Sequence, residues 1–127
     1  MKGIFVNEDG GVRYAWAIVG GLKTIETRSR NMLSALVGER VAIIRTHRHS
    51  NPIVLGYATI SGSSFCKAAD FQRFWTEHLV PVGSQYDATD KGKWFYHMTD
   101  AERCTPYPLP SSAVRHGRSW CEWEVMA

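Results

Sequence analysis

The strongest constraint on the fold is a pair of apolar, β-branched runs separated by a short basic loop. Residues 39–47 contain Val-Ala-Ile-Ile at their centre, and residues 53–61 read Ile-Val-Leu-Gly-Tyr-Ala-Thr-Ile-Ser. Short apolar runs bounded by turn residues are typical of buried strands. The two runs therefore predict an antiparallel hairpin whose first strand is covered on both faces. Gly56 inside the second run predicts a bulge or a sharp bend.

The rest of the chain adds further strands and two helices to this hairpin. Strands follow from apolar or alternating runs, and helices follow from apolar residues that recur three and four positions apart. The second helix would have an aromatic face, and turn-forming residues at 8–11 precede the first helix. We expect strands at residues 3–7, 24–29, 93–98 and 120–126, and helices at residues 11–20 and 67–79.

Loops and irregular segments fill the second half of the sequence. Residues 81–93 and 111–119 are polar and predict loops, and three prolines within residues 99–110 predict an irregular edge. About six strands that mostly follow the first helix indicate an α+β domain. We expect a small, strongly bent, mostly antiparallel β-barrel with about two packed helices. Residues 1–127 are short enough to form a single domain.

Composition narrows the class of protein. Hydrophobic residues make up 44% of the chain and charged residues 21%, which is typical of an ordered globular protein. The sequence contains no apolar run near the ~20 residues that span a bilayer, and it opens on no charged-then-apolar leader. Three cysteines far apart in sequence indicate reduced thiols, and hence a cytoplasmic protein. Without a Cys-x-x-Cys pair, we expect no bound metal, and we expect no cofactor.

A short helix, a double glycine and a charged strand follow one another between residues 14 and 28. Two consecutive glycines can end a helix, because glycine adopts the left-handed conformation that the turn requires. Thr24, Glu26 and Arg28 would then share one face of the strand, with Lys23 in the turn before it. Such a group either forms a solvated edge or lines a pocket for a polar ligand.

The charge around this strand favours an anionic ligand. Residues 23–48 contain six Lys or Arg and two Glu, so their balance of +4 exceeds the +3 of the whole chain. Lys23 and Arg28 could hold a phosphate, and Glu26 could accept hydrogen bonds from a base or a sugar. Arg45 adds charge, and an aromatic residue such as Trp16 could stack on a base.

The same stretch resembles the ASCH domain family of the PUA-like superfamily. Residues 21–28 match the family signature Gly-x-Lys-x-x-Glu-x-Arg. Residues 13–21 are similar to the Pro-Trp-Ala-x-x-Ile-x-x-Gly that often precedes it, with Arg13 and Tyr14 in place of proline and tryptophan. The resemblance implies a PUA-like β-barrel with helices at its ends and recognition of RNA or a modified nucleoside. Residues 81–119 match no part of the family.

Three functions stay open at this point. The first is binding of RNA or a nucleotide-like ligand in a cleft around the signature. The second is hydrolysis, because some ASCH-like proteins cleave RNA or deacetylate N4-acetylcytidine with a lysine that assists a threonine. Lys23 matches that lysine, but the nucleophile position holds Glu26, so both would be catalytic only if the chain is an enzyme. The third is a protein-interaction module, which would expose an apolar patch. The expected ligand-binding residues are Lys23, Thr24, Glu26, Arg28, Trp16 and Arg45.

Overall fold

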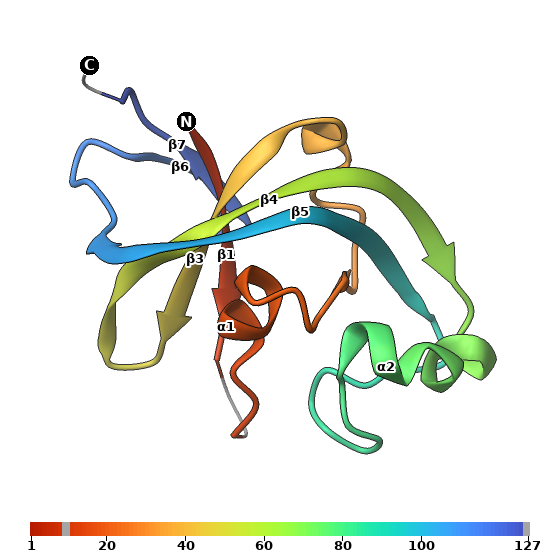
Figure 1. The fold of residues 1–127 in the computed structure, drawn as a ribbon. Helices are drawn as coiled ribbons and strands as arrows, with labels where there is room; N and C mark the ends of the chain where they lie inside the picture. The colour runs from red at the N-terminus through yellow and green to blue at the C-terminus, as the bar shows by residue number, and fades with distance from the viewer. Residues whose placement is uncertain (9–10, 126–127) are drawn as a thin grey trace.

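The computed structural model describes residues 1–8 and 11–125, and these form one seven-stranded sheet with two short α-helices (Figure 1). The strands are β1 (Lys2–Asn7), β2 (Ile25–Arg28), β3 (Arg40–His47), β4 (Ser50–Cys66), β5 (Lys93–Pro108), β6 (Val114–His116) and β7 (Trp120–Glu122). The helical segments are α1 (Tyr14–Val19), α2 (Trp75–His78) and the 3-10 turns η1 (Ser34–Leu36) and η2 (Ala68–Phe74). The expected turn at residues 8–11 and the end of the expected last strand fall partly outside the described residues.

The sheet is mixed but mostly antiparallel, in the order β2-β5-β4-β3-β1-β7-β6. Over the described residues, β1 and β3 are the one parallel pair, and every other neighbouring pair is antiparallel. The α+β class and the antiparallel hairpin of β3 and β4 are therefore confirmed. Figure 1 shows β4 and β5 as a long, strongly bowed pair. In the described part of the chain, β2 and β6 leave the sheet open at both edges, so the predicted barrel is not confirmed.

Gly56 bends the long strand β4, as the sequence predicts. The register of β4 shifts beside Gly56 in its pairing with both β3 and β5. A Cβ atom at this position would lie 2.9 Å from Val19 Cγ1 and would also overlap the backbone carbonyl of Glu102. Only glycine allows the three segments to approach this closely. The close approach brings α1 onto the concave part of the sheet.

Two strands are longer than the sequence indicates. β4 continues to Cys66, and β5 continues through the segment that we expected to be irregular, up to Pro108. Beyond Met98, whose amide donates to the carbonyl of Thr24, β5 pairs with no described strand on the side of β2, because β2 is only four residues long. Proline is tolerated on such an edge, where a missing N–H breaks no ladder bond. The predicted loop 111–119 also contains a short strand, β6.

The expected helix at residues 67–79 is instead a 3-10 turn followed by four residues of α-helix. The ring Nε2 of His78 lies 2.8 Å from the Phe71 carbonyl oxygen, which accepts this bond instead of a helical amide. The amide of Trp75 donates to the carbonyl of Gln72, three residues back. Leu79 then ends α2 in the left-handed conformation, with φ 61°. The segment therefore does not form the regular helix that the aromatic spacing predicts, because the buried His78 ring takes up the Phe71 carbonyl.

The core lies on both faces of β1 and β3. Alternate residues of these strands, such as Ile43 and Ile44, belong to two separate apolar clusters. This confirms that the strand at residues 39–47 is covered on both faces. Helix α1 is shorter than expected, and its inner side is buried through Tyr14, Ala15, Ile18 and Val19. Within residues 1–8 and 11–125, no helix has the length and apolar character needed to cross a membrane.

Candidate functional site

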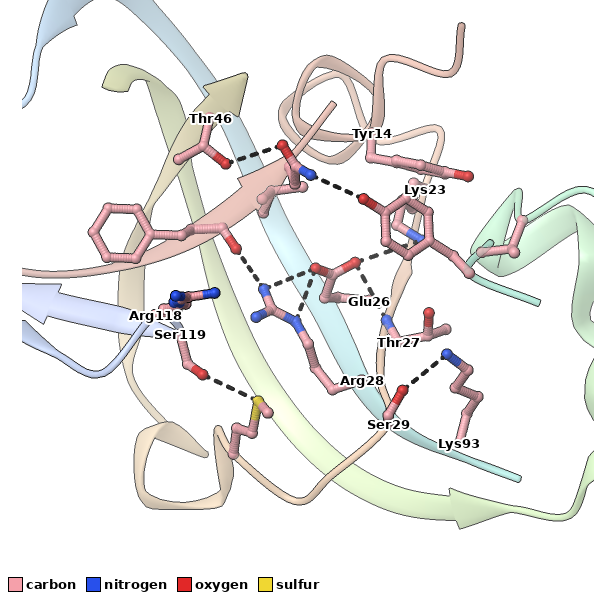
Figure 2. A pocket seen from close by; sticks show the side chains of 16 residues that line it. Tyr14, Lys23, Glu26, Thr27, Arg28, Ser29, Thr46, Lys93, Arg118 and Ser119 are labelled. Carbon is pink, nitrogen blue, oxygen red and sulfur yellow. Dashed lines mark hydrogen bonds and ion pairs between the residues drawn. The ribbon is translucent and has the colours of Figure 1, made fainter. Parts of the chain in front are cut away.

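A pocket of about 310 Å³ opens between β1, β2 and the turn that joins β6 to β7 (Figure 2). Its lining combines apolar side chains with basic ones. Three of the residues singled out in the sequence line it, namely Lys23, Glu26 and Arg28. The other lining residues are Phe5, Val6, Asn7, Tyr14, Thr27, Ser29, Met32, Thr46, Val80, Tyr86, Lys93, Arg118 and Ser119.

The double glycine directs Lys23 into the protein. Gly21 has a φ of 78°, which glycine adopts without strain. The chain then folds back over α1, so that the amides of Leu22 and Lys23 both donate to the carbonyl of Ala17. The Lys23 side chain consequently points inward and is only 1% exposed.

Lys23, Glu26 and Arg28 form one group joined by ion pairs, with hydrogen bonds between Arg28 and Glu26. Nζ of Lys23 lies 3.7 Å from Oε1 of Glu26 and donates to the backbone carbonyl of His78 at 2.5 Å. Arg28 donates from Nε and Nη2 to Oε2 of Glu26, at 3.2 and 2.9 Å, and from Nη2 to the carbonyl of Phe5 at 2.6 Å. Figure 2 shows Glu26 between the two cations. The carboxylate is therefore held in one orientation in the pocket.

Burial changes the acidity of the groups around Glu26. It lowers the pKa of Lys23 from 10.5 to about 8, although the nearby Glu26 carboxylate acts in the opposite direction. Burial also raises the pKa of Tyr14 to about 12, with smaller contributions from Tyr86 and Glu26. The Lys23 ammonium lies 5.0 Å from the centre of the Tyr14 ring, a cation–π distance. Lys23 thus has a neutral form that is accessible near pH 8.

A second lysine lines another part of the pocket. Lys93, the first residue of β5, is 6% exposed, and its Nζ donates to the hydroxyl of Ser29 at 3.1 Å. Burial lowers the pKa of Lys93. The sequence carried one signal for this position, since Lys93 is two residues before the buried Phe95 and so lies on the same side of the strand.

The rim of the pocket comes from segments that match no known motif. Arg118 and Ser119, in the turn between β6 and β7, lie on the side opposite Lys93 in Figure 2. Arg118 is exposed and makes no hydrogen bond or ion pair with any residue that the structure describes. Tyr86 accepts a hydrogen bond from Asn7 at 3.0 Å and packs edge-on against Tyr14. Reading the sequence alone missed these residues, because loop conformation brings them to the pocket.

The remaining predicted site residues lie outside the pocket lining. Thr24 is exposed, and its amide donates to the carbonyl of Glu77. Trp16 packs under the guanidinium of Arg13, 5.3 Å from its ring centre, and Arg45 is not among the lining residues. Among residues 1–8 and 11–125, no group of three or more His, Cys, Asp or Glu side chains could hold a metal ion.

The sequence and the fold of the chain were compared with those of known proteins. A scan of protein-family models finds no match, and a search of curated proteins finds no similar sequence. Among solved structures, the chain is similar to the ASCH protein from Zymomonas mobilis, with a TM-score of 0.67 and 23% identity over 84% of this chain and 73% of that chain.

Two variants of the same protein give similar results. Its serine-to-alanine variant has a TM-score of 0.66 at 24% identity, over 84% of this chain and 73% of the other. Its tyrosine-to-phenylalanine variant has a TM-score of 0.64 at 25% identity, over 84% and 75%. The chain therefore has an ASCH domain fold, as the signature at residues 21–28 implies.

Proposed function

We propose that the pocket binds one nucleotide unit of RNA or a similar nucleotide-like anion. The observation that carries the proposal is the buried Glu26, fixed between Lys23 and Arg28 in a pocket that is otherwise basic. Among the residues that the structure describes, four Lys or Arg side chains and one carboxylate line it, so their formal balance is +3 when all are charged. Such a pocket attracts anions, while Glu26 can accept hydrogen bonds from the amino or hydroxyl groups of a nucleoside.

Size and lining support a ligand of this class. A volume of about 310 Å³ lies at the lower end of the range for small-molecule sites. Phe5, Met32 and Val80 supply apolar surface for the faces of a base, and Tyr86 offers an aromatic ring at the edge. Base–aromatic contacts contribute about 1–3 kcal/mol each in single-stranded nucleic acid binding.

Hydrolysis is a second candidate, favoured by the pKa of Lys23 near 8. A lysine that loses its proton near the working pH can act as a general base. Thr27 also lines the pocket and carries a hydroxyl, although Glu26 occupies the position at which related amidohydrolases have their nucleophilic threonine. A hydroxyl nucleophile needs such a base, because it is weakly reactive at its own pKa.

Binding and turnover of two substrates separate these candidates. Fluorescence anisotropy with a labelled single-stranded RNA reports binding, and chromatography of RNA and of N4-acetylcytidine reports cleavage. The variants are Lys23→Ala and, as a matched control, Lys91→Ala, which removes an exposed lysine outside the pocket. Binding without turnover supports a protein that only binds its ligand, and turnover that Lys23→Ala abolishes supports a hydrolase. Absence of both would overturn the proposal.

A further inference from the structure

Lys93 is a buried residue whose ammonium group has no counter-ion in the described part of the chain. The residue is 6% exposed, and its hydrogen bond to Ser29 reaches only a neutral hydroxyl. Among residues 1–8 and 11–125, no carboxylate oxygen lies within ion-pair distance of its Nζ. A buried charge is costly unless it is paired, so proteins rarely leave one unmatched. Lys93 also lines the pocket.

The other buried lysine differs from Lys93 in this respect. Lys23 already has a carboxylate and a carbonyl as partners, at 3.7 and 2.5 Å. The Glu26 carboxylate is in turn shared with Arg28. Glu26 therefore neutralises much of the charge of Lys23 and Arg28. The two cations are less suited to hold a ligand anion than the sequence pattern indicated.

The nearby carboxylate of Asp87 does not take the role of a counter-ion for Lys93. Oδ1 of Asp87 accepts hydrogen bonds from the side chain of Gln72 at 2.9 Å and from the backbone amide of Ala88 at 2.8 Å. Oδ2 accepts from the amide of Gly83 at 2.8 Å. These bonds hold Asp87 within its own loop, so its effect on Lys93 is only a longer-range attraction.

The placement of Lys93 beside Ser29 follows from the strand register. Strands β2 and β5 are antiparallel, and Arg28 pairs with Trp94 at the end of the ladder. The next positions along the two strands are Ser29 and Lys93, which therefore meet at the pocket wall. Figure 2 shows the Lys93 amine reaching toward the Ser29 hydroxyl. Together they present an ammonium and a hydroxyl, both of which can donate to phosphate oxygens.

We propose that Lys93 and Ser29 form the phosphate subsite of the pocket, while Glu26, held by Lys23 and Arg28, contacts the nucleoside part of the ligand. This assignment rests on the proposed function and specifies which end of the pocket receives which end of the ligand. A bound phosphate would supply the missing counter-ion and would stabilise the charged form of Lys93, which burial disfavours.

Calorimetric titration with cytidine and with cytidine 5′- and 3′-monophosphate tests the assignment. The variant Lys93→Met keeps the length of the side chain and removes the charge, and Lys91→Met makes the same charge change at an exposed position two residues away. We expect the wild type and Lys91→Met to prefer at least one monophosphate over cytidine. In Lys93→Met that preference should fall by about ten-fold or more, with cytidine affinity little changed. An unchanged preference in a folded Lys93→Met would overturn the assignment and leave nucleotide binding standing.

A second measurement on the wild type does not depend on the variant folding or on nucleotide binding. The ¹³Cε–¹Hε signal of Lys93 is followed by NMR as inorganic phosphate is added, with chloride at matched ionic strength as the control. A saturable shift with phosphate alone supports the subsite, even if no nucleotide binds better than phosphate and the proposed function fails. A Lys93 signal that responds equally to both salts contradicts it.

Discussion

Nζ of Lys23 lies 3.7 Å from Oε1 of Glu26, and the two side chains are only 1% and 9% exposed. Arg28 holds the other oxygen of the same carboxylate. Buried ionic groups of this kind are sensitive to the loss of any one member, because the remaining charges stay desolvated. The arrangement therefore links the stability of the fold to the chemistry of the pocket.

Removal of the carboxylate should cost stability. Glu26→Gln leaves the buried Lys23 and the partly buried Arg28 without a counter-charge, so we expect the free energy of unfolding to fall by about 3–5 kcal/mol. Glu39→Gln is the matched control, because its ion pair with Lys2 is at the surface and should contribute no more than about 1 kcal/mol. Urea unfolding of both variants measures the difference. Equal losses would show that the Glu26 group does not behave as a buried ionic cluster.

The pKa of Lys23 predicts how stability changes with pH. Between about pH 8 and pH 10.5 the unfolded chain retains a proton that the folded lysine has lost. Unfolding then takes up a proton, so the free energy of unfolding rises with pH across this window, and the gain is lost as the pH falls through 8. Relative to Lys23→Met, the wild type should gain up to about 3 kcal/mol.

Urea unfolding of the wild type and Lys23→Met at several pH values gives this difference directly. Lys91→Met, which removes an exposed ammonium, serves as the control and should follow the wild type. A constant offset between the wild type and Lys23→Met across the window would mean that burial does not shift the titration of Lys23.

The bend in β4 makes a prediction that is independent of the pocket. In Gly56→Ala, the new methyl group would meet the backbone of Glu102 and Arg103, so we expect a loss of about 2–4 kcal/mol in the free energy of unfolding. Gly62→Ala is a control in the same strand, because its nearest neighbour, Cδ2 of His97, is 4.0 Å away. That substitution should change stability by no more than about 0.5–1 kcal/mol. Similar melting temperatures for the two variants would contradict the close approach.

Much of the fold was predictable because local patterns and tertiary packing agree. The apolar centre of β3, the bulge at Gly56 and the glycine turn before Lys23 all follow from short-range rules. The extension of β5 to Pro108 did not, since proline signals a break unless the strand is known to lie at an edge. The aromatic segment was predicted as one helix, because nothing in its spacing reveals that the buried ring of His78 takes the Phe71 carbonyl.

The candidate site was predictable only where one continuous motif forms it. Lys23, Glu26 and Arg28 lie within six residues of one another in sequence and line the pocket together. Strand pairing brings Lys93 to the same pocket, and loop conformation brings Arg118 there. Neither can be read from sequence positions so far from the motif. The turn before Lys23 follows from the two glycines, but the partner of its ammonium group, the His78 carbonyl in α2, could not be predicted, because it lies 55 positions away in sequence.

The affinity for RNA should depend on the salt concentration, and removal of the exposed cation Arg118 should change that dependence. The logarithm of the association constant should fall linearly with the logarithm of salt concentration, by about 0.7 for each phosphate neutralised on a single strand. Arg118→Gln should lower that slope by roughly the same amount if its guanidinium contacts a phosphate, without loss of stability. Fluorescence anisotropy over a series of salt concentrations gives the slopes. A salt-independent affinity would rule out phosphate contacts.

The most direct test of nucleotide binding in this pocket is amide chemical-shift mapping of the ¹⁵N-labelled protein with a short single-stranded RNA. We predict saturable shifts in β2 (Ile25–Arg28) and at Ser29, Asn7 and Ser119, with little change at the far end of β5 near Tyr107. Shifts that cluster away from the pocket, or no shifts at millimolar RNA, would contradict the account.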